Sequence, residues 1–151
     1  KTMKEEITYN IFDKVDIRIG TVISVKKNEK ARKPSLVIEV DFGGNIGIKQ
    51  SSAQITHFYN EENLVGKQVI GVCNFPEKNI AGVVSQFLVL GAIDKDGKVV
   101  LVHPSLHLQE SFLQTRMSNI RLDRLRDLSE SFDAELRFDS IGTYYRGLFH
   151  M

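Results

Sequence analysis

The sequence predicts an all-β domain with short helices, followed by a C-terminal segment of different composition. Short stretches that alternate between apolar and polar residues, separated by turn signals, fill roughly the first 100 residues. The chain has 151 residues, 42% hydrophobic and 26% charged, as is typical of soluble globular proteins. All 12 lysines precede residue 110, whereas six of the eight arginines follow it. We therefore expect a domain over residues 1–107 and an extension over residues 108–151.

The first predicted strand, residues 16–25, has Ile17, Ile19 and Val25 on its apolar side, and Gly20 indicates a bend or bulge. Residues 35–42 predict a second half-buried strand, because every even position from 36 to 42 is apolar. Ser51 or Ser52 is then expected to cap a short helix running through Gln54, Ile55 and Phe58. Further strands are predicted over residues 46–50, 68–75, 85–90 and 98–102. Five or six short strands and one helix predict a small five-stranded barrel of the OB type.

Neither a membrane span nor an export signal is predicted. No apolar run approaches the ~20 residues that a membrane helix needs. Residues 1–6 are charged, without the apolar stretch of a signal peptide. The single cysteine, Cys73, cannot form a disulfide within the chain and suits a reducing compartment. We expect a cytoplasmic protein that does not insert into membranes.

The signatures of catalysis are absent from the sequence. His103 and His107 are four residues apart, but Pro104 argues against a helix that carries both as metal ligands, and no Glu lies between them. Cys73 stands in an apolar stretch, which favours a buried small side chain over a nucleophile. No glycine-rich phosphate loop occurs. We therefore expect no catalytic residue, no metal site and no cofactor.

Several stretches of the sequence match one known family in order: residues 16–22, 42–43, 46–56, 66–70, 74–76, 80–82, 85 and 88–91. Over residues 11–104 the chain resembles this family, the tRNA-binding domain, which occurs free-standing and appended to methionyl- and phenylalanyl-tRNA synthetases. Within the family the sequence is most similar to the CsaA branch, described as export-related chaperones. The resemblance implies an OB-fold homodimer that binds tRNA or another structured RNA without catalysis. The CsaA branch adds unfolded or pre-secretory polypeptides, or the secretion machinery, as alternative partners.

A net charge of +1 does not identify a partner, but the distribution of charge is informative. Residues 26–33 carry five cations that could neutralise phosphates, although such a run is also typical of a solvated loop. Ser51, likewise, could meet a phosphate or act only as a helix cap. The segment 74–82 matches the RNA-facing segment of the family, but has fewer basic residues than we expect of relatives. The candidate RNA-binding residues are Lys30, Arg32, Lys33, Lys49, Ser51, Asn74, Lys78 and Ser85.

The chaperone alternative requires exposed apolar side chains or a free strand edge. The candidate peptide-binding residues are Phe58, Phe75 and Val84, of which Phe75, beside Pro76 at a predicted strand end, is the strongest. Salt separates the two hypotheses, because RNA binding weakens steeply with salt and apolar binding does not.

The extension no longer matches the family. Apolar residues at near-helical spacing predict an amphipathic helix over residues 112–136. It could pack on the barrel or dimer, derive from unrelated coding sequence, or add RNA contacts. The last hypothesis would use Arg116, Arg121, Arg124 and Arg126. Six acidic residues balance the six arginines after residue 110, which argues against a strong attraction to phosphate.

Overall fold

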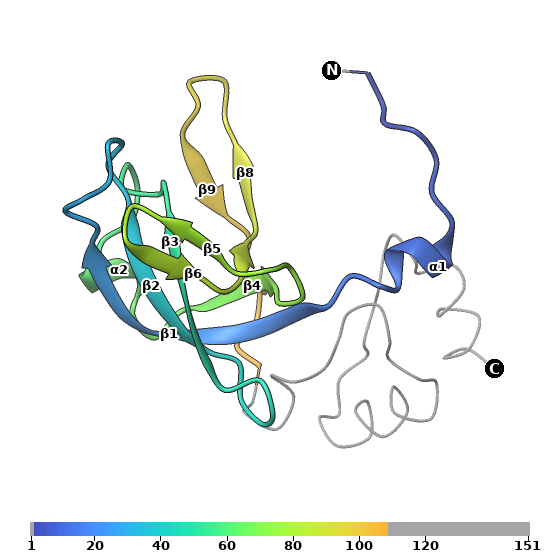
Figure 1. The fold of residues 1–151 in the computed structure, drawn as a ribbon, viewed down its shortest axis with the longest axis horizontal. Helices are drawn as coiled ribbons and strands as arrows, with labels where there is room; N and C mark the ends of the chain where they lie inside the picture. The colour runs from blue at the N-terminus through green and yellow to red at the C-terminus, as the bar shows by residue number, and fades with distance from the viewer. Residues whose placement is uncertain (1, 109–151) are drawn as a thin grey trace. The chain divides into compact units, whose positions relative to one another are not determined.

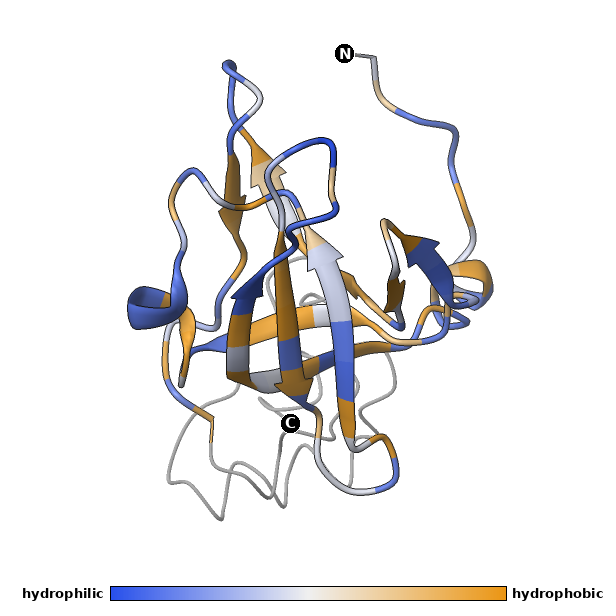
Figure 2. Cartoon of the chain, turned by 60° about the vertical axis from the view of Figure 1, so that its left-hand side comes forward, coloured by the Kyte–Doolittle hydropathy of each residue, from blue (hydrophilic) through white to orange (hydrophobic). Residues whose placement is uncertain are grey.

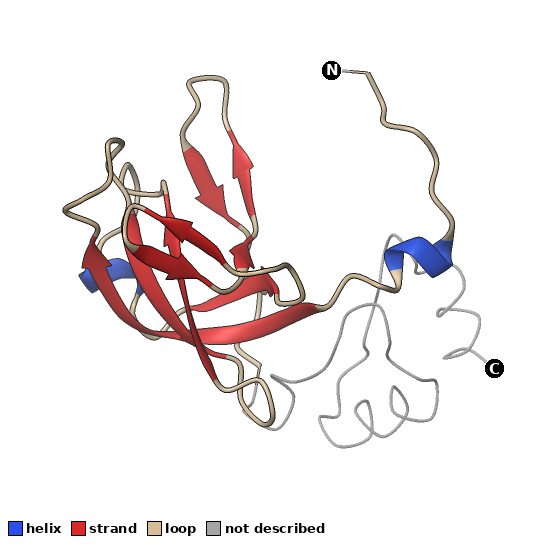
Figure 3. Cartoon of the chain, in the orientation of Figure 1, coloured by secondary structure: helices blue, strands red, loops and turns tan. Residues whose placement is uncertain are grey.

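The computed structural model describes residues 2–108, whose regular elements are β-strands and two one-turn helices (Figure 3). Five strands form one antiparallel sheet in the order β3-β2-β1-β4-β7 (Figure 1). They are β1 (Ile17–Lys27), β2 (Leu36–Asp41), β3 (Ile48–Ala53), β4 (Gln68–Val72) and β7 (Leu88–Val89). Two smaller hairpins comprise β5 (Lys78–Ile80) with β6 (Val83–Ser85), and β8 (Gly91–Ile93) with β9 (Val99–Leu101). The helices are α1 (Tyr9–Phe12) and α2 (Glu61–Leu64).

The five-stranded sheet curls into a nearly closed barrel. Its two edges approach where the backbone N–H of Gln86, just before β7, donates to the carbonyl of Gln50 in β3 at 2.8 Å. The hydroxyl of Ser51 donates to the carbonyl of Phe87, also at 2.8 Å. This strand order and closure are those of the OB fold. The predicted fold class is confirmed for the described residues.

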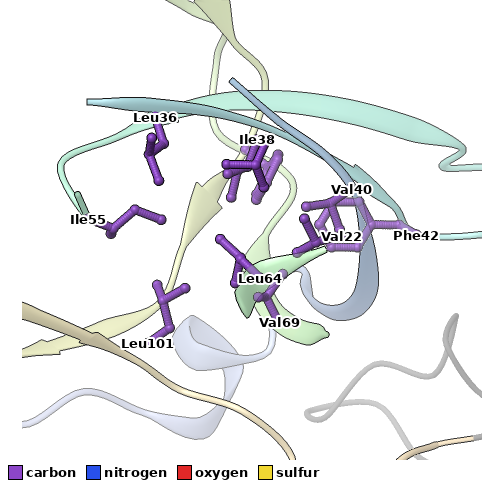
Figure 4. Packing of buried hydrophobic residues seen from close by; sticks show 11 residues of the cluster. Val22, Leu36, Ile38, Val40, Phe42, Ile55, Leu64, Val69 and Leu101 are labelled. Carbon is purple, nitrogen blue, oxygen red and sulfur yellow. The ribbon is translucent and has the colours of Figure 1, made fainter. Parts of the chain in front are cut away.

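The barrel interior is filled by aliphatic side chains around two aromatic rings (Figure 4). The rings of Phe42 and Phe87 meet edge to face, with centroids 5.0 Å apart. Gly20 faces this interior, and a Cβ there would lie 2.5 Å from Cγ1 of Val40. Gly20 therefore lets β1 and β2 approach closely. The other members of the cluster are Val22, Val25, Leu36, Ile38, Ile55, Leu64, Val69 and Leu101.

The bulge in β1 lies after Gly20, between Val22 and Ser24, where the register against β2 shifts. The shift places Val25 inside the barrel, while Ile17 belongs to a second, separate apolar cluster with Ile70 and Val72 of β4. Ile19 packs against that second cluster as well. The prediction that Ile17, Ile19 and Val25 share one face was wrong, because one extra residue reverses the alternation that follows it.

The predicted helix after Ser51 or Ser52 was also wrong. Both serines belong to β3, whose pairing with β2 continues to Ala53. The helix starts later, with Asn60 as its N-cap: Asn60 and Asn63 each accept a hydrogen bond from the other's backbone N–H. Strand pairing thus overrides the local capping preference of serine.

Two other predicted strands end differently in the structure. The strand expected over residues 68–75 ends at Val72. The stretch 85–90 is divided between β6 and β7, because Gln86 and Phe87 turn to meet β3. The hairpin β5–β6 and strand β8 were not predicted. Among the described residues, no helix is long and apolar enough to cross a membrane. The helix predicted over residues 112–136 lies outside them, as do its arginines.

Candidate functional site

The loop between β1 and β2, residues 28–35, lies beside the tip of the β5–β6 hairpin (Figure 1). Asn28 connects them: its side-chain Nδ2 donates to the hydroxyl of Ser52 at 3.3 Å and to the carbonyl of Ile80 at 3.4 Å. We call residues 28–35 and 78–85 together the loop–hairpin surface. It combines segments about 50 residues apart in the sequence at one end of the barrel, since Asn28 and Ile80 are separated by 52 positions.

The turn of the β5–β6 hairpin lies against this loop. Ala81 and Gly82 both have positive φ angles, 49° and 81°, as a tight hairpin turn requires. The N–H of Gly82 donates to Oδ1 of Asn79 at 3.0 Å. Lys30 crosses the turn: a Cβ built on Gly82 would lie 3.5 Å from Cδ and 3.9 Å from Nζ of Lys30. The Lys30 ammonium is therefore presented at the hairpin tip.

Four predicted cations are exposed on this surface: Lys30, Arg32, Lys33 and Lys78. Within residues 2–108 the ion pairs are Arg18–Asp16 and Lys98–Asp96, so these four cations form none there. Lys78 lies on β5, two residues before Ile80, or about 7 Å along a strand. The nearby Glu77 accepts a hydrogen bond from Nε2 of Gln86 at 3.1 Å. The surface thus presents cations that are available to an anionic partner.

Two predicted RNA-binding residues are buried instead. Ser51 and Ser85 are only 4% and 8% exposed. The hydroxyl of Ser51 donates to the carbonyl of Phe87, and that of Ser85 accepts from the N–H of Ser52 at 2.8 Å. The Ser51 hydroxyl therefore helps to close the barrel, and the Ser85 hydroxyl attaches the hairpin to β3. Neither hydroxyl is exposed to a ligand.

Two further predicted residues lie elsewhere. Lys49 is half-buried on β3 opposite Val40. Asn74 is exposed, but its Oδ1 accepts from the N–H of Asp16 at 2.9 Å and its Nδ2 donates to the carbonyl of Lys14 at 2.6 Å. Asn74 thus ties the end of β4 to the chain that precedes β1. The structure does not bring Lys49 or Asn74 into the contacts that join the loop to the hairpin.

The candidate peptide-binding residues are exposed, with values of 43% for Phe58, 55% for Phe75 and 36% for Val84. They come from three separate segments. A more continuous apolar area was missed: Leu88, Val100 and Val102 are 51%, 47% and 41% exposed. The strands of this region are hydrophobic up to the polar turn of the β8–β9 hairpin (Figure 2). The signal available was a pair of continuous apolar runs, residues 88–92 and 99–102.

This area continues the second apolar cluster over the outside of the barrel. Leu90, which packs on that cluster, donates its N–H to the carbonyl of Ile70 at 2.8 Å and accepts at its own carbonyl from Val102 at 3.1 Å. We call Leu88, Leu90, Val100 and Val102 the outer apolar face.

Within residues 2–108, Cys73 and His103 are not arranged as a nucleophile or a metal ligand would be. Burial, with the nearby Asp16 carboxylate, raises the pKa of the Cys73 thiol to about 11, whereas Arg18 and Lys49 act in the opposite direction. The thiol is therefore protonated near neutral pH. Nδ1 of His103 lies 2.6 Å from the carbonyl of Gln68. Among the described residues there is no group of three or more His, Cys, Asp or Glu suited to a metal ion.

Comparison with known proteins places these features in a family. A family model for the tRNA binding domain matches residues 17–111. The methionine–tRNA ligases of Chlorobium limicola and Clostridium perfringens are 37% and 38% identical over 103 residues, 68% of this chain. That match spans only 14% and 16% of the length of those ligases.

Two solved structures have nearly the same extent as the matched region. The CsaA chaperone protein from Picrophilus torridus is 43% identical with a TM-score of 0.67, over 74% of this chain and 99% of that one. The chaperone CsaA from Bacillus anthracis is 42% identical with a TM-score of 0.68, over 75% and 99%. This chain is thus similar both to a small part of much longer proteins and to two shorter chains over almost their whole length.

Proposed function

The chain belongs to the tRNA-binding-domain family, and from this premise we propose that it binds tRNA or another folded RNA through the loop–hairpin surface, without catalysis. The observation that carries the proposal is the gathering of exposed cations that have no ion-pair partner within residues 2–108. Phosphates are the natural partners of such groups, because each neutralised phosphate releases a counterion. A cytoplasmic site of action, where RNA is accessible, is part of the proposal.

The neighbouring strands favour phosphate recognition over base stacking. OB folds commonly bind nucleic acid over strands 2 and 3 and the adjoining loops. Here the outer positions of β2 hold Val37, Glu39 and Asp41, paired with Ser52, Gln50 and Ile48 of β3. These side chains include no aromatic ring on which an unpaired base could stack, and two carboxylates repel phosphate. A folded RNA, held by its backbone at the loop and hairpin, suits this arrangement better than a single strand.

A titration with labelled total tRNA at several salt concentrations tests the proposal. We expect log affinity to fall linearly with log salt, and Lys78→Ala to reduce the slope by about one unit. Lys67→Ala, which removes an exposed cation outside the surface, is the matched control and should leave the slope unchanged. Absence of binding at low salt, or equal effects of the two variants, would contradict the proposal.

We also propose that the chain forms a homodimer through the outer apolar face. Exposed, adjoining apolar side chains are stabilised when a partner covers them, and here they continue a cluster that is already buried. Light scattering should give twice the chain mass of 17.1 kDa. Val100→Asp should shift the protein to a monomer; a monomeric parent protein would contradict this part of the proposal.

The second candidate function is binding of unfolded polypeptides, including export substrates. It is favoured by Phe75, which is 55% exposed and lies outside the outer apolar face, and by the word chaperone in the names of two similar structures. An unfolded, fluorescently labelled polypeptide should then bind with an affinity that persists at high salt and falls in Phe75→Ser. Binding of tRNA that weakens with salt, with no polypeptide binding, would eliminate this candidate.

A further inference from the structure

Asn28 forms hydrogen bonds through both its backbone and its side chain. Its backbone N–H donates to the carbonyl of Ser35 at 2.9 Å, and its carbonyl accepts from Ala31 at 3.2 Å. Its side-chain Oδ1 accepts from the N–H of Lys30 at 3.3 Å. These three bonds close the base of the loop and turn the chain toward Lys30. Asn28, the first residue of the loop, thus holds the loop in its conformation.

The same side chain also reaches outside the loop. Its Nδ2 is shared between the hydroxyl of Ser52 on β3 and the carbonyl of Ile80 on β5. A primary amide supplies an acceptor and a donor group at once, which neither a carboxylate nor a hydroxyl of similar size can supply in the same geometry. One residue therefore connects three elements: the loop, the barrel wall and the hairpin.

We propose that Asn28 is the positioning residue of the loop–hairpin surface, holding Lys30 over the hairpin turn so that loop and hairpin present one cationic surface to RNA. This inference rests on the proposed function. Without the amide, the loop leaves the hairpin and Lys30 is no longer held where it neutralises a phosphate, so that contact is lost. Asn28 touches no phosphate itself; it acts through Lys30.

A double-mutant cycle with tRNA tests the inference, with Asn28→Ala, Lys30→Ala and the double variant measured over a salt series. We expect each single variant to reduce the slope by about one unit, and the double variant to bind within about twofold of Lys30→Ala. Asn28→Ala combined with Lys78→Ala should instead show additive losses. Asn45→Ala, the same change in the exposed turn between β2 and β3, should bind as the parent does.

Hydrogen exchange on the free protein separates failure of this inference from failure of the proposed function. Exchange at the Lys30 amide should rise in Asn28→Ala, because this N–H donates to the deleted Oδ1, while the β1 and β2 amides should not change. If the parent protein binds no tRNA, the proposed function fails while faster exchange at Lys30 still supports the positioning of the loop. If the parent binds and Asn28→Ala keeps its slope, or its loss adds fully to that of Lys30→Ala, Asn28 does not act through Lys30 and the inference is overturned.

Discussion

The barrel wall and the β5–β6 hairpin are held in place by different interactions. The wall strands β1, β2 and β4 are joined by backbone ladders and enclose a packed apolar core. The hairpin is joined to the barrel by side chains: Gln50 reaches the carbonyl of Val84, and Ser85 accepts from the backbone of Ser52. We therefore expect stability to depend on the wall, and the proposed RNA binding to depend on the few polar side chains that hold the hairpin. Substitutions in the two regions should separate these properties.

Phe42→Ala should have the largest effect on stability. Phe42 is fully buried in the barrel core and packs against Phe87. Its truncation should lower the free energy of unfolding by about 3–5 kcal/mol. Chemical denaturation measures the loss, and the tRNA salt slope of the remaining folded protein should not change. A changed slope would mean that core and surface are not separable.

Ser51→Ala lies at the boundary between the two regions. It leaves the buried carbonyl of Phe87 without its 2.8 Å hydrogen bond, so the free energy of unfolding should fall by about 1–3 kcal/mol. Denaturation and tRNA titration of the same preparation measure stability and binding together. A selective loss of RNA affinity, with stability preserved, would restore Ser51 as a direct RNA contact.

Gly82→Ala and Gly97→Ala form a matched pair in the two hairpin turns, since both glycines have φ of 81°. Each alanine should lower the free energy of unfolding by about 1–2 kcal/mol, because this conformation is strained for an L-residue. Only Gly82 adjoins Lys30; a Cβ on Gly97 would meet nothing within 4 Å. We expect tRNA affinity to fall in Gly82→Ala alone. Equal binding by both variants would exclude the hairpin tip from the RNA surface.

Cys73 should produce a small effect confined to alkaline pH. Its pKa is raised to about 11 in the folded protein from 9.0, so the unfolded thiol ionises first as pH rises. The unfolded state then binds fewer protons, and stability declines between about pH 9 and 11. Denaturation at pH 8 and pH 10, compared with Cys73→Ala, measures this contribution. An unchanged pH dependence in the variant would show that burial does not perturb the thiol.

The sequence predicted the wall better than the surface. Alternating apolar residues predicted β2, and the strand predicted over residues 46–50 overlaps β3. These two strands were accessible to sequence reasoning because they pair as neighbours in the chain. The bend in β1 was predicted at Gly20, whereas the bulge lies after Val22, because no local feature of the sequence distinguishes the two positions. Lys30, Arg32 and Lys33 were identified by the charge of their loop, and Lys78 by the resemblance of its segment to the family. Their arrangement could not be predicted, because Asn28 meets Ile80 across 52 positions, and the burial of Ser51 and Ser85 depends on barrel closure.

Hydrogen exchange with and without tRNA, followed along residues 2–108, tests the proposed surface without any substitution. We expect slower exchange in residues 28–35 and 78–85 when tRNA is bound, and unchanged exchange over residues 88–93 and 99–102. Slower exchange confined to the outer apolar face, or no change anywhere under conditions where tRNA binds, would contradict recognition by the loop–hairpin surface.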